Sequence, residues 1–437
     1  MQLPMKISFM IQISDFIFEQ EFKMKRLIIT FLASLHVAKA LATPSINLQS
    51  QHADLTPAET LQAITESCID LGISTFDVYG DFSLDDSKSY LRQFESEIAQ
   101  EFGKEDAVFM PSGVMAQGIA LMINGGSKFA VHHSSHLLLH EQEAYRELIG
   151  MEPLVIDSRS RIDANGYSIP PMSFQDAKEA FDKYRQDEGV DRVGDSLSTL
   201  ILELPHRELG GKCTSWEDIL QMRDLCDQQG VKFHCDGARI FEATCYYNDA
   251  SLSEIASVFD SIYISFYKGL GGISGAMLLG DADFCEEARK WLRRFGGNLF
   301  TVLPYAVSGW AGYQRHWVDV EENLSFVEKH HKLQRLVTHV SKENVVSFDP
   351  ETPEVNMIHG YFRQGVEEVI AGIDRVEQQT GLRVLKRVGK VNEGDHAYNA
   401  GYRSKFEWTM GAANGSISDE DFVKAWKALA SELSTTS

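Results

Sequence analysis

The sequence has few cysteines, and those present follow no metal-binding or redox pattern. Six cysteines occur in 437 residues, and none forms a CxxC pair or the ligand spacing of a zinc site. This scatter predicts unpaired, mostly buried thiols that behave as small apolar side chains. A chain of this length buries enough surface to fold without disulfide or metal cross-links. The sequence therefore predicts no disulfide framework and no metal site.

Basic residues are in deficit. The chain has 41 lysines and arginines against 63 aspartates and glutamates, which gives a formal net charge of −22. A strongly acidic protein is repelled by nucleic acid and by anionic lipid headgroups, so we expect neither nucleic acid nor a membrane as a partner. Apolar residues make up 43% of the chain and include 25 Phe, 14 Tyr and 6 Trp, which excludes disorder as its main state.

Long apolar runs are also missing. The stretch Leu27–Leu35 is shorter than the roughly 20 residues that span a bilayer. It follows the basic Met24-Lys25-Arg26 and precedes Ala40-Leu41-Ala42, and these three parts are typical of a secretory signal peptide. An amphipathic arm packed on a partner subunit is the alternative. We expect residues 1–42 to be a signal peptide or N-terminal extension, with a periplasmic or secreted protein in the first case and a cytoplasmic one otherwise.

From about residue 55 the chain alternates helical patterns with short apolar runs, which is typical of an α/β fold with a mainly parallel sheet. Strands are predicted at 107–110, 197–204, 231–235, 261–266 and 276–279. Helices are predicted at 87–102, 114–123, 174–186 and from a cap at Thr214 or Ser215 to Gln229, with Gly230 as the stop. Beyond about residue 315, strands are predicted at 345–348, 357–362 and 406–410. We expect a large domain over 43–315 and a small C-terminal α+β domain over 316–437.

Two reactive side chains stand at the ends of predicted strands. Asp236 ends the strand 231–235, and Lys268 follows the strand 261–266 and precedes a glycine-rich turn. Ligands bind outside the carboxyl ends of the strands in open α/β sheets. Pyridoxal phosphate needs a lysine amine, with which it forms an imine, and a carboxylate that keeps its ring nitrogen protonated. The pair favours a pyridoxal-phosphate site, although a helix-capping Asp and a surface Lys would give the same pattern.

Several motifs occur in the order found in one known family. They are Asp77-Val78-Tyr79-Gly80, Phe102-Gly103-Lys104-Glu105, Pro111-Ser112-Gly113, His136 with Glu141, Leu202-Glu203 with His206, Asp236-Gly237-Ala238-Arg239, Lys268-Gly269-Leu270-Gly271 and Gly296-Gly297. Over roughly residues 75–315 the chain resembles the threonine aldolase/β-eliminating lyase family of fold-type-I pyridoxal-phosphate enzymes. The resemblance implies the fold-type-I large domain, this cofactor, an amino-acid substrate and a homodimer or homotetramer.

The resemblance also implies catalytic roles. Lys268 would hold the cofactor covalently and move protons, and Asp236 would pair with the ring nitrogen. His136 would stack on the cofactor ring and is a candidate base. His206 would face the substrate hydroxyl.

Two binding roles follow from the same resemblance. The cofactor phosphate would lie at a helix N-terminus, where free N–H groups and the helix dipole favour an anion, on Ser112, Gly113 and Val114. Arg239 would line the cofactor site and reach the substrate carboxylate with its bidentate guanidinium.

The chain departs from the family pattern at several contacts. Val114 stands where a threonine is usual, and Tyr267 stands where a serine usually precedes the lysine. The arginine expected after Gly296-Gly297 is missing, and no Arg-Ser-Asp-Thr segment occurs near the N-terminus. The arginine expected in the small domain falls on Glu407. Arg403 and Lys405 are the nearby substitutes, of which we assign Arg403 to the substrate. These changes alter the contacts to the substrate more than those to the cofactor.

The leading hypothesis is a lyase that cleaves a threonine-like β-hydroxy-α-amino acid to glycine and an aldehyde. β-Elimination from a Cys- or Trp-like substrate and racemisation of a small amino acid are the alternatives, since all three start from the same cofactor bound to Lys268. His206 favours a hydroxylated substrate, whereas Tyr267 beside the lysine would favour racemisation as a second acid/base.

Overall fold

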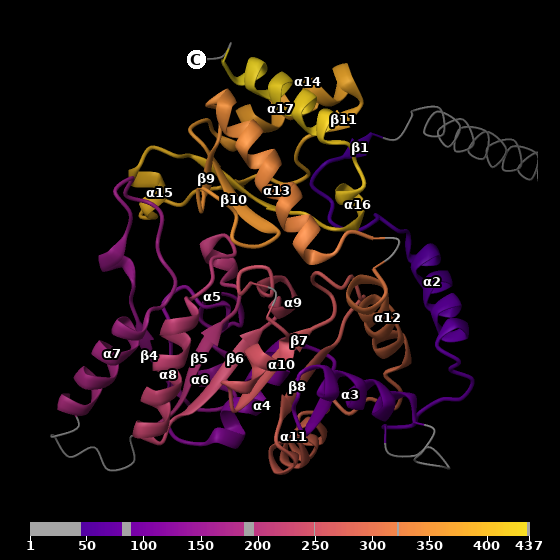
Figure 1. Cartoon of the computed structure of the whole chain (residues 1–437), viewed down its shortest axis with the longest axis vertical. Helices are drawn as coiled ribbons and strands as arrows, with labels where there is room; N and C mark the ends of the chain where they lie inside the picture. Colours follow the sequence, from indigo (N-terminus) through magenta and orange to yellow (C-terminus); the bar gives the residue numbers. More distant parts are fainter. Residues whose placement is uncertain (1–44, 81–88, 188–195, 249, 321–322, 435–437) are drawn as a thin grey trace, which may run out of the picture.

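The computed structural model describes residues 45–80, 89–187, 196–248, 250–320 and 323–434. The predicted signal peptide lies outside these residues. Figure 1 shows a large domain below and a small domain above it, with the C-terminal helices at the top.

The large domain is built on a seven-stranded sheet with the order β2-β8-β7-β6-β5-β3-β4. The strands are β2 (Asp106–Met110), β3 (Lys128–His132), β4 (Glu152–Ile156), β5 (Leu197–Glu203), β6 (Lys232–Gly237), β7 (Ser261–Ser265) and β8 (Ala276–Gly280). Within this sheet only β8 runs antiparallel to its neighbours. The predicted α/β fold with a mainly parallel sheet is confirmed, whereas β3 and β4 were not predicted.

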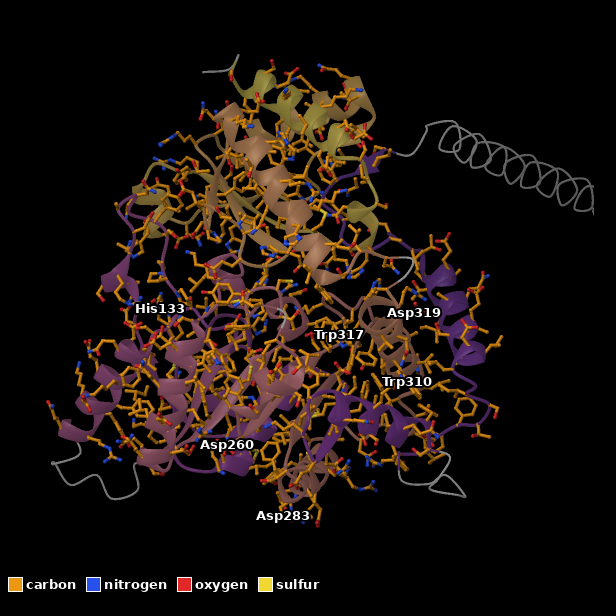
Figure 2. All side chains as sticks on the ribbon, viewed as in Figure 1. His133, Asp260, Asp283, Trp310, Trp317 and Asp319 are labelled. Atoms are coloured by element: carbon orange, nitrogen blue, oxygen red, sulfur yellow. The ribbon has the colours of Figure 1, made fainter. Side chains whose placement is uncertain are left out.

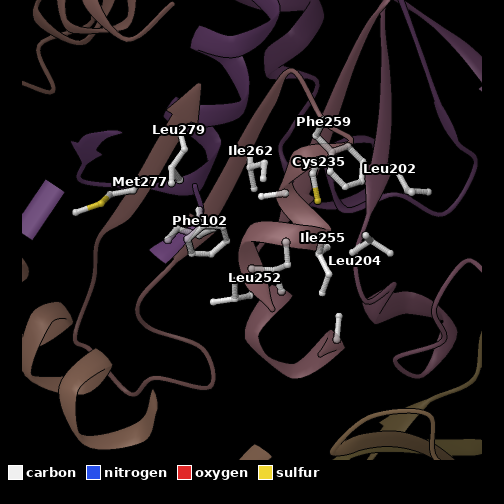
Figure 3. Packing of buried hydrophobic residues seen from close by; sticks show 14 of the residues in the cluster. Phe102, Leu202, Leu204, Cys235, Leu252, Ile255, Phe259, Ile262, Met277 and Leu279 are labelled. Carbon is white, nitrogen blue, oxygen red and sulfur yellow. The ribbon is translucent and has the colours of Figure 1, made fainter. Parts of the chain in front are cut away.

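Both faces of the sheet are covered, and the side chains of β8 show how. Met277 and Leu279 pack into the main core, while Ala276 and Leu278 pack into a second cluster, because successive side chains of a strand point to opposite faces. The main core is formed with α3 (Tyr90–Glu101), α7 (Phe174–Asp187), α8 (Trp216–Gln229), α10 (Leu252–Ser257) and α12 (Leu303–Tyr313), and Figure 3 shows Leu279 near Phe102 in it. The second cluster is formed with α4 (Gly113–Asn124) and α11 (Ala282–Arg294).

Capping residues set the two ends of α8. The Ser215 hydroxyl accepts a hydrogen bond from the Asp218 N–H at 3.1 Å, and Gly230 ends α8 with φ 67°, as predicted.

The α12 helix and the turn that follows it are tied to α3 by the indole N–H groups of Trp310 and Trp317, which Figure 2 labels. They donate to carboxylates of α3 at 2.7 and 2.8 Å.

The small domain contains an antiparallel sheet with the order β12-β13-β10-β9. Its strands are β9 (Ser347–Asp349), β10 (Met357–Phe362), β12 (Gly389–Lys390) and β13 (Ser404–Thr409). The strand predicted at 357–362 has these bounds, and the other two predicted strands are present with shifted ends. The helices α13 (Phe326–Val340), α14 (Val366–Thr380) and α17 (Asp419–Ser434) pack with this sheet around the buried Trp408 and Trp426.

The N-terminal segment crosses the expected domain boundary. Its strand β1 (Ile46–Asn47) pairs in parallel with β11 (Leu382–Arg383), and Leu48 is fully buried in the core of the small domain. The large domain was expected to begin at residue 43, but the first described residues pack with the C-terminal domain. The helix α2 (Pro57–Asp70) then packs on α12.

Short helices complete the described fold: α5 (His136–His140), α6 (Ala144–Glu147), α9 (Ile240–Ala243), α15 (His396–Asn399) and α16 (Ala412–Gly415). None of the helices in the described ranges has the length and apolar character of a membrane span. No disulfide bond joins the six cysteines, all of which lie in the described ranges, and four of them are buried.

Candidate active site

The predicted site residues gather where β5, β6 and β7 end. Glu203 and Asp236 are register partners on β5 and β6, and Asp236 is in turn paired with Tyr263 on β7. Lys268 follows three residues after the end of β7. Parallel strands bring their carboxyl ends to one edge of a sheet, which is why residues far apart in the sequence meet here.

Asp236 is a buried carboxylate with little local compensation. Only 2% of its surface is exposed, and its Oδ1 accepts one hydrogen bond, of 3.2 Å, from the Ala238 N–H. Burial raises the pKa of Asp236 to about 8, and the nearby charges of Glu203 and Glu141 add to this rise. A cationic partner at this carboxylate would reverse the effect, as a protonated ring nitrogen does.

Lys268 is held in place through its main chain. The Nε2 of His52 lies 2.8 Å from the Lys268 carbonyl oxygen, and the Lys268 Nζ lies 4.8 Å from the centre of the Tyr267 ring. Burial lowers the pKa of Lys268, and the charges of Arg239 and Arg207 lower it further. A lower pKa favours the neutral amine, which is the form that attacks a carbonyl group.

The predicted phosphate turn is the N-terminus of α4. Ser112 is its N-cap, with its Oγ 3.4 Å from the Met115 N–H, and Val114 is exposed beside it. A Cβ atom at Gly113 would overlap the hydroxyl and ring of Tyr263, so the close approach of turn and ring requires glycine. The turn therefore presents free main-chain N–H groups at the same edge of the sheet as Asp236.

The two predicted histidines share one carboxylate. The main-chain N–H of His136 donates to Glu203 Oε2 at 3.1 Å, and the Nε2 of His206 lies 3.7 Å from the same oxygen. They differ in accessibility, since the side chain of His136 is 35% exposed and that of His206 is 3% exposed. The Nε2 of His206 also lies 3.1 Å from both the Oγ and the carbonyl oxygen of Ser134. His136 is therefore the imidazole that a substrate can reach.

The His136 ring is oriented by an acidic partner. Its Nδ1 lies 3.1 Å from Glu141 Oε1, and this hydrogen bond raises the pKa of His136 against the opposing effect of burial. With Nδ1 bound to the carboxylate, the remaining nitrogen, Nε2, is the atom that exchanges a proton.

Arg239 is a buried side chain that faces two carboxylates. Its side chain is 7% exposed, with Nη1 3.6 Å from Glu242 Oε1 and Nη2 3.4 Å from Glu407 Oε1. Two carboxylates thus already face this guanidinium. Burial raises the pKa of Glu242 to about 7, and neither of its carboxylate oxygens has a hydrogen-bond partner among the described residues.

Arg403 is not brought to the site, in contrast to its predicted role. It precedes β13, and its Nη1 donates to the carbonyl oxygens of Tyr398 and Tyr402 at 3.1 and 2.8 Å. It lies four residues before Glu407, which on a strand amounts to roughly 13 Å. The position of Glu407 is the one that faces Arg239.

Four residues of the site had no role assigned from the sequence: His52, Arg207, Glu203 and Glu242. Glu203 carried a signal, because it belongs to a family motif at a strand end, and Arg207 directly follows His206. His52 carried none, since the hydrogen bond to Lys268 joins residues 216 positions apart.

A cleft of about 630 Å³ opens beside these residues between the two domains. Its lining is polar and charged on both sides, with His140, Arg207 and Glu208 from the large domain and His359, Lys405 and Glu407 from the small domain. The N-terminal residues Gln49–Asp54 close its third side. No three metal-binding side chains gather anywhere in the described part of the chain.

These residues fit pyridoxal phosphate. The buried carboxylate of Asp236 lacks a cation, the Gly113 turn offers free amides for a phosphate, and Lys268 supplies an amine of lowered pKa. Asp236 would hold the ring nitrogen, Ser112 and Gly113 the phosphate, and Lys268 the covalent link. Tyr267 occupies the serine position of the family and leaves that contact to the phosphate altered.

The chain is similar in sequence to known proteins. The sequence profile described as beta-eliminating lyase matches residues 75–363. Low-specificity L-threonine aldolase 1 of Arabidopsis thaliana is 24% identical over 68% of this chain and 78% of its own length. The low-specificity L-threonine aldolase of Escherichia coli K12 is 29% identical over 51% of this chain and 60% of its own length.

A solved structure agrees with the sequence matches. A Listeria monocytogenes EGD-E protein provisionally described as an L-allo-threonine aldolase superposes with a TM-score of 0.72 and 29% identity, over 89% of this chain and 97% of that one. The fold, the site geometry and the match over most of the large domain lead to one conclusion: the chain belongs to the β-eliminating lyase family of fold-type-I pyridoxal-phosphate-dependent lyases.

Proposed function

We propose that this lyase cleaves a β-hydroxy-α-amino acid to glycine and an aldehyde. The relatives described as threonine aldolases support this reaction class. The observation that carries the proposal is the placement of His136. It is the one predicted histidine with an accessible ring, and its Nδ1 is held by Glu141 at 3.1 Å.

In the proposed reaction, His136 Nε2 takes the proton of the substrate β-hydroxyl as the Cα–Cβ bond breaks. The aldehyde forms from Cβ, and the electron pair of the broken bond stays at Cα until a proton from solvent or Lys268 completes glycine. Bound pyridoxal phosphate supplies the electron-withdrawing ring that stabilises this charge. Asp236 keeps that ring nitrogen protonated, and Glu203 fixes the loop that carries His136 through the 3.1 Å hydrogen bond to its N–H.

A substrate panel tests the proposal. Purified holoenzyme is incubated with threonine, allo-threonine, serine, cysteine and alanine, and aldehyde, pyruvate and enantiomer composition are measured. We expect aldehyde and glycine from at least one β-hydroxy amino acid, and none from a Lys268→Ala variant. A panel without aldehyde from any hydroxylated substrate contradicts the proposal.

Racemisation is the second candidate because of Tyr267. Its side chain is 36% exposed, and its ring lies against Lys268, with 4.8 Å between the ring centre and Nζ. Removal and return of a Cα proton on opposite faces needs two acid/base groups, and a lysine with an adjacent tyrosine would supply them. Conversion of L-alanine to D-alanine in the panel, lost in Tyr267→Phe, would favour this reaction.

A further inference from the structure

A buried carboxylate lies against the turn that follows Lys268, and the proposed reaction assigns it no role. Glu242 belongs to the short helix α9 and is 0% exposed. Neither of its carboxylate oxygens accepts a hydrogen bond from another described residue. Burial of such a group is costly, and groups of this kind gather at functional sites. We propose that Glu242 is a positioning residue that controls how strongly the Lys268 nitrogen holds a proton.

The packing of Gly269 shows how close this carboxylate comes to the catalytic lysine. A Cβ atom at Gly269 would lie 2.5 Å from Glu242 Oε1 and 3.1 Å from the Cε1 and Cζ atoms of the Phe326 ring. A side chain at this position would therefore overlap the carboxylate and crowd the ring. Glu242 thus packs directly against the main chain of the residue that follows Lys268.

Arg239 links Glu242 to Lys268 electrostatically. Its Nη1 lies 3.6 Å from Glu242 Oε1 and has no hydrogen-bond partner among the described residues. Burial lowers the pKa of Lys268, and among the nearby charges that of Arg239 has the largest effect. The charge of Lys268 is in turn one of those that act on Glu242, and such an interaction is mutual. Because the negative charge of Glu242 offsets Arg239, it favours the protonated form of the Lys268 nitrogen.

Charged groups from both domains surround Glu242. Burial raises its pKa to about 7, the charge of Arg239 opposes this rise, and the charge of Glu407 adds to it. Lys329 of α13 also acts on Glu242; it is 1% exposed, and burial lowers its pKa to about 8. Two imidazoles that Lys329 affects are neutral at pH 7 because burial lowers their pKa values, namely those of His52 and His316. The charge of this buried cluster therefore changes close to neutral pH.

The other carboxylates that act on Lys268 have stronger partners. Glu407 lies between two guanidinium groups, with Oε2 2.9 Å from Arg207 Nε and Oε1 3.4 Å from Arg239 Nη2. Asp236 is expected to pair with the ring nitrogen of the cofactor. Glu242 instead faces a single guanidinium, so its charge is less compensated than that of Glu407.

The protonation state of the Lys268 nitrogen affects every reaction considered for this site. When the cofactor is bound, this nitrogen belongs to the imine, and a protonated imine is attacked more readily by the amino group of a substrate. The inference therefore requires only that the cofactor is linked to Lys268. It does not depend on whether aldol cleavage or racemisation follows.

The test uses the absorbance of the cofactor, which changes when the imine nitrogen loses its proton. Holoenzyme without substrate is titrated from about pH 5 to about pH 10, and the midpoint of the absorbance change is recorded. We expect Glu242→Gln to lower this midpoint by roughly one pH unit or more, the effect of one unit charge acting over about 10 Å at an effective dielectric constant of about 20. Glu242→Asp keeps the charge but moves it away from Gly269, so its midpoint should lie between those of wild type and Glu242→Gln.

Glu354→Gln is the matched control. Glu354 is also a carboxylate whose pKa is raised by burial, but it accepts a hydrogen bond from the Cys213 N–H at 2.7 Å and faces Lys212. We expect its loss to leave the midpoint in place, and circular dichroism establishes that each variant is folded.

Three results would overturn the proposal: a midpoint that is not lowered in Glu242→Gln, a midpoint in Glu242→Asp as low as in Glu242→Gln, or an equal shift in Glu354→Gln. If Glu242→Gln does not retain the cofactor, Glu242→Asp decides alone, and a midpoint at or above the wild-type value overturns the proposal. No substrate turns over in this titration, so failure to release an aldehyde bears on the proposed reaction alone.

Discussion

Glu203 and Asp236 are direct register partners on adjacent parallel strands, so two carboxylates lie side by side at the buried edge of the sheet. They are 8% and 2% exposed. Glu203 is compensated by the N–H groups of His136 and Arg207, whereas Asp236 receives one weak hydrogen bond. The arrangement concentrates negative potential at the place where the cofactor ring nitrogen is expected, and favours its protonated form.

This arrangement predicts a pH-dependent stability of the cofactor-free protein. The pKa of Asp236 is about 8 in the folded chain, above its ordinary value of 3.8, so the folded state holds a proton that the unfolded state releases. The contribution of Asp236 to stability is therefore present below pH 4 and is lost as the pH rises towards 8. Asp236→Asn cannot ionise, and we expect its stability relative to wild type to increase from pH 5 to pH 8. Urea unfolding of both apo-proteins at the two pH values measures this, and parallel pH profiles would contradict it.

A second prediction concerns His136 and Glu141. Their hydrogen bond raises the pKa of His136, and the neutral imidazole is the form that accepts a proton. In the wild type kcat/KM should therefore rise with pH through this raised pKa. Glu141→Gln removes the negative charge, lowers the pKa of His136 and shifts the acidic limb of the pH–rate profile to lower pH.

The pair of His140 and Glu208 provides a control for this shift. Glu208→Gln removes a carboxylate 2.9 Å from a neighbouring histidine of the same helix, with 41% of the His140 side chain exposed. We expect the acidic limb to stay in place in this variant. If the acidic limb of the pH–rate profile moves equally in both variants, its pKa reflects the general charge of the cleft and not His136.

A large part of this fold could be predicted from sequence, because buried parallel strands are short apolar runs and helices carry caps such as Ser215. The cofactor pair could also be predicted, since Asp236 lies near the end of one strand and Lys268 follows the next strand along the chain. Contacts between segments that are distant in the sequence could not be predicted, because neither residue type nor spacing encodes them. The contact of Arg207 with Glu407 joins residues 200 positions apart. Arg403 does not take the place of the arginine expected at position 407, because four residues along a strand separate the two positions by roughly 13 Å.

A third prediction tests the phosphate turn. A methyl group at Gly113 would overlap the hydroxyl and ring of Tyr263, so Gly113→Ala must displace the ring or the turn. We expect a loss of roughly 1–3 kcal/mol in folding stability and at least about tenfold weaker cofactor binding. Gly365→Ala is the matched control, because Gly365 is also an N-cap-region glycine and no atom lies within 4 Å of the added carbon. Reconstitution of the apo-proteins with the cofactor, followed by absorbance, gives both affinities. Equal affinities in the two variants would show that the turn does not contact the phosphate.

The last prediction concerns the N-terminal segment that joins the small domain to the catalytic lysine. Gln49 donates from its Nε2 to the Glu407 carbonyl oxygen at 2.6 Å, and three residues later His52 contacts the Lys268 carbonyl oxygen at 2.8 Å. Burial lowers the pKa of His52, so its ring is neutral at pH 7 and donates from Nε2–H. This segment therefore positions the peptide of Lys268 relative to the strand that carries Glu407.

His52→Ala removes this donor and leaves the Lys268 carbonyl without it. We expect kcat to fall roughly tenfold, because small displacements of a reacting amine are costly, while the Kd for glycine changes less. His52→Gln retains an amide donor of similar reach and should recover part of kcat, which a loss of packing alone would not allow. Thermal unfolding of each holoenzyme separates the two effects. If His52→Gln and His52→Ala lose kcat equally at equal stability, the hydrogen bond does not position Lys268.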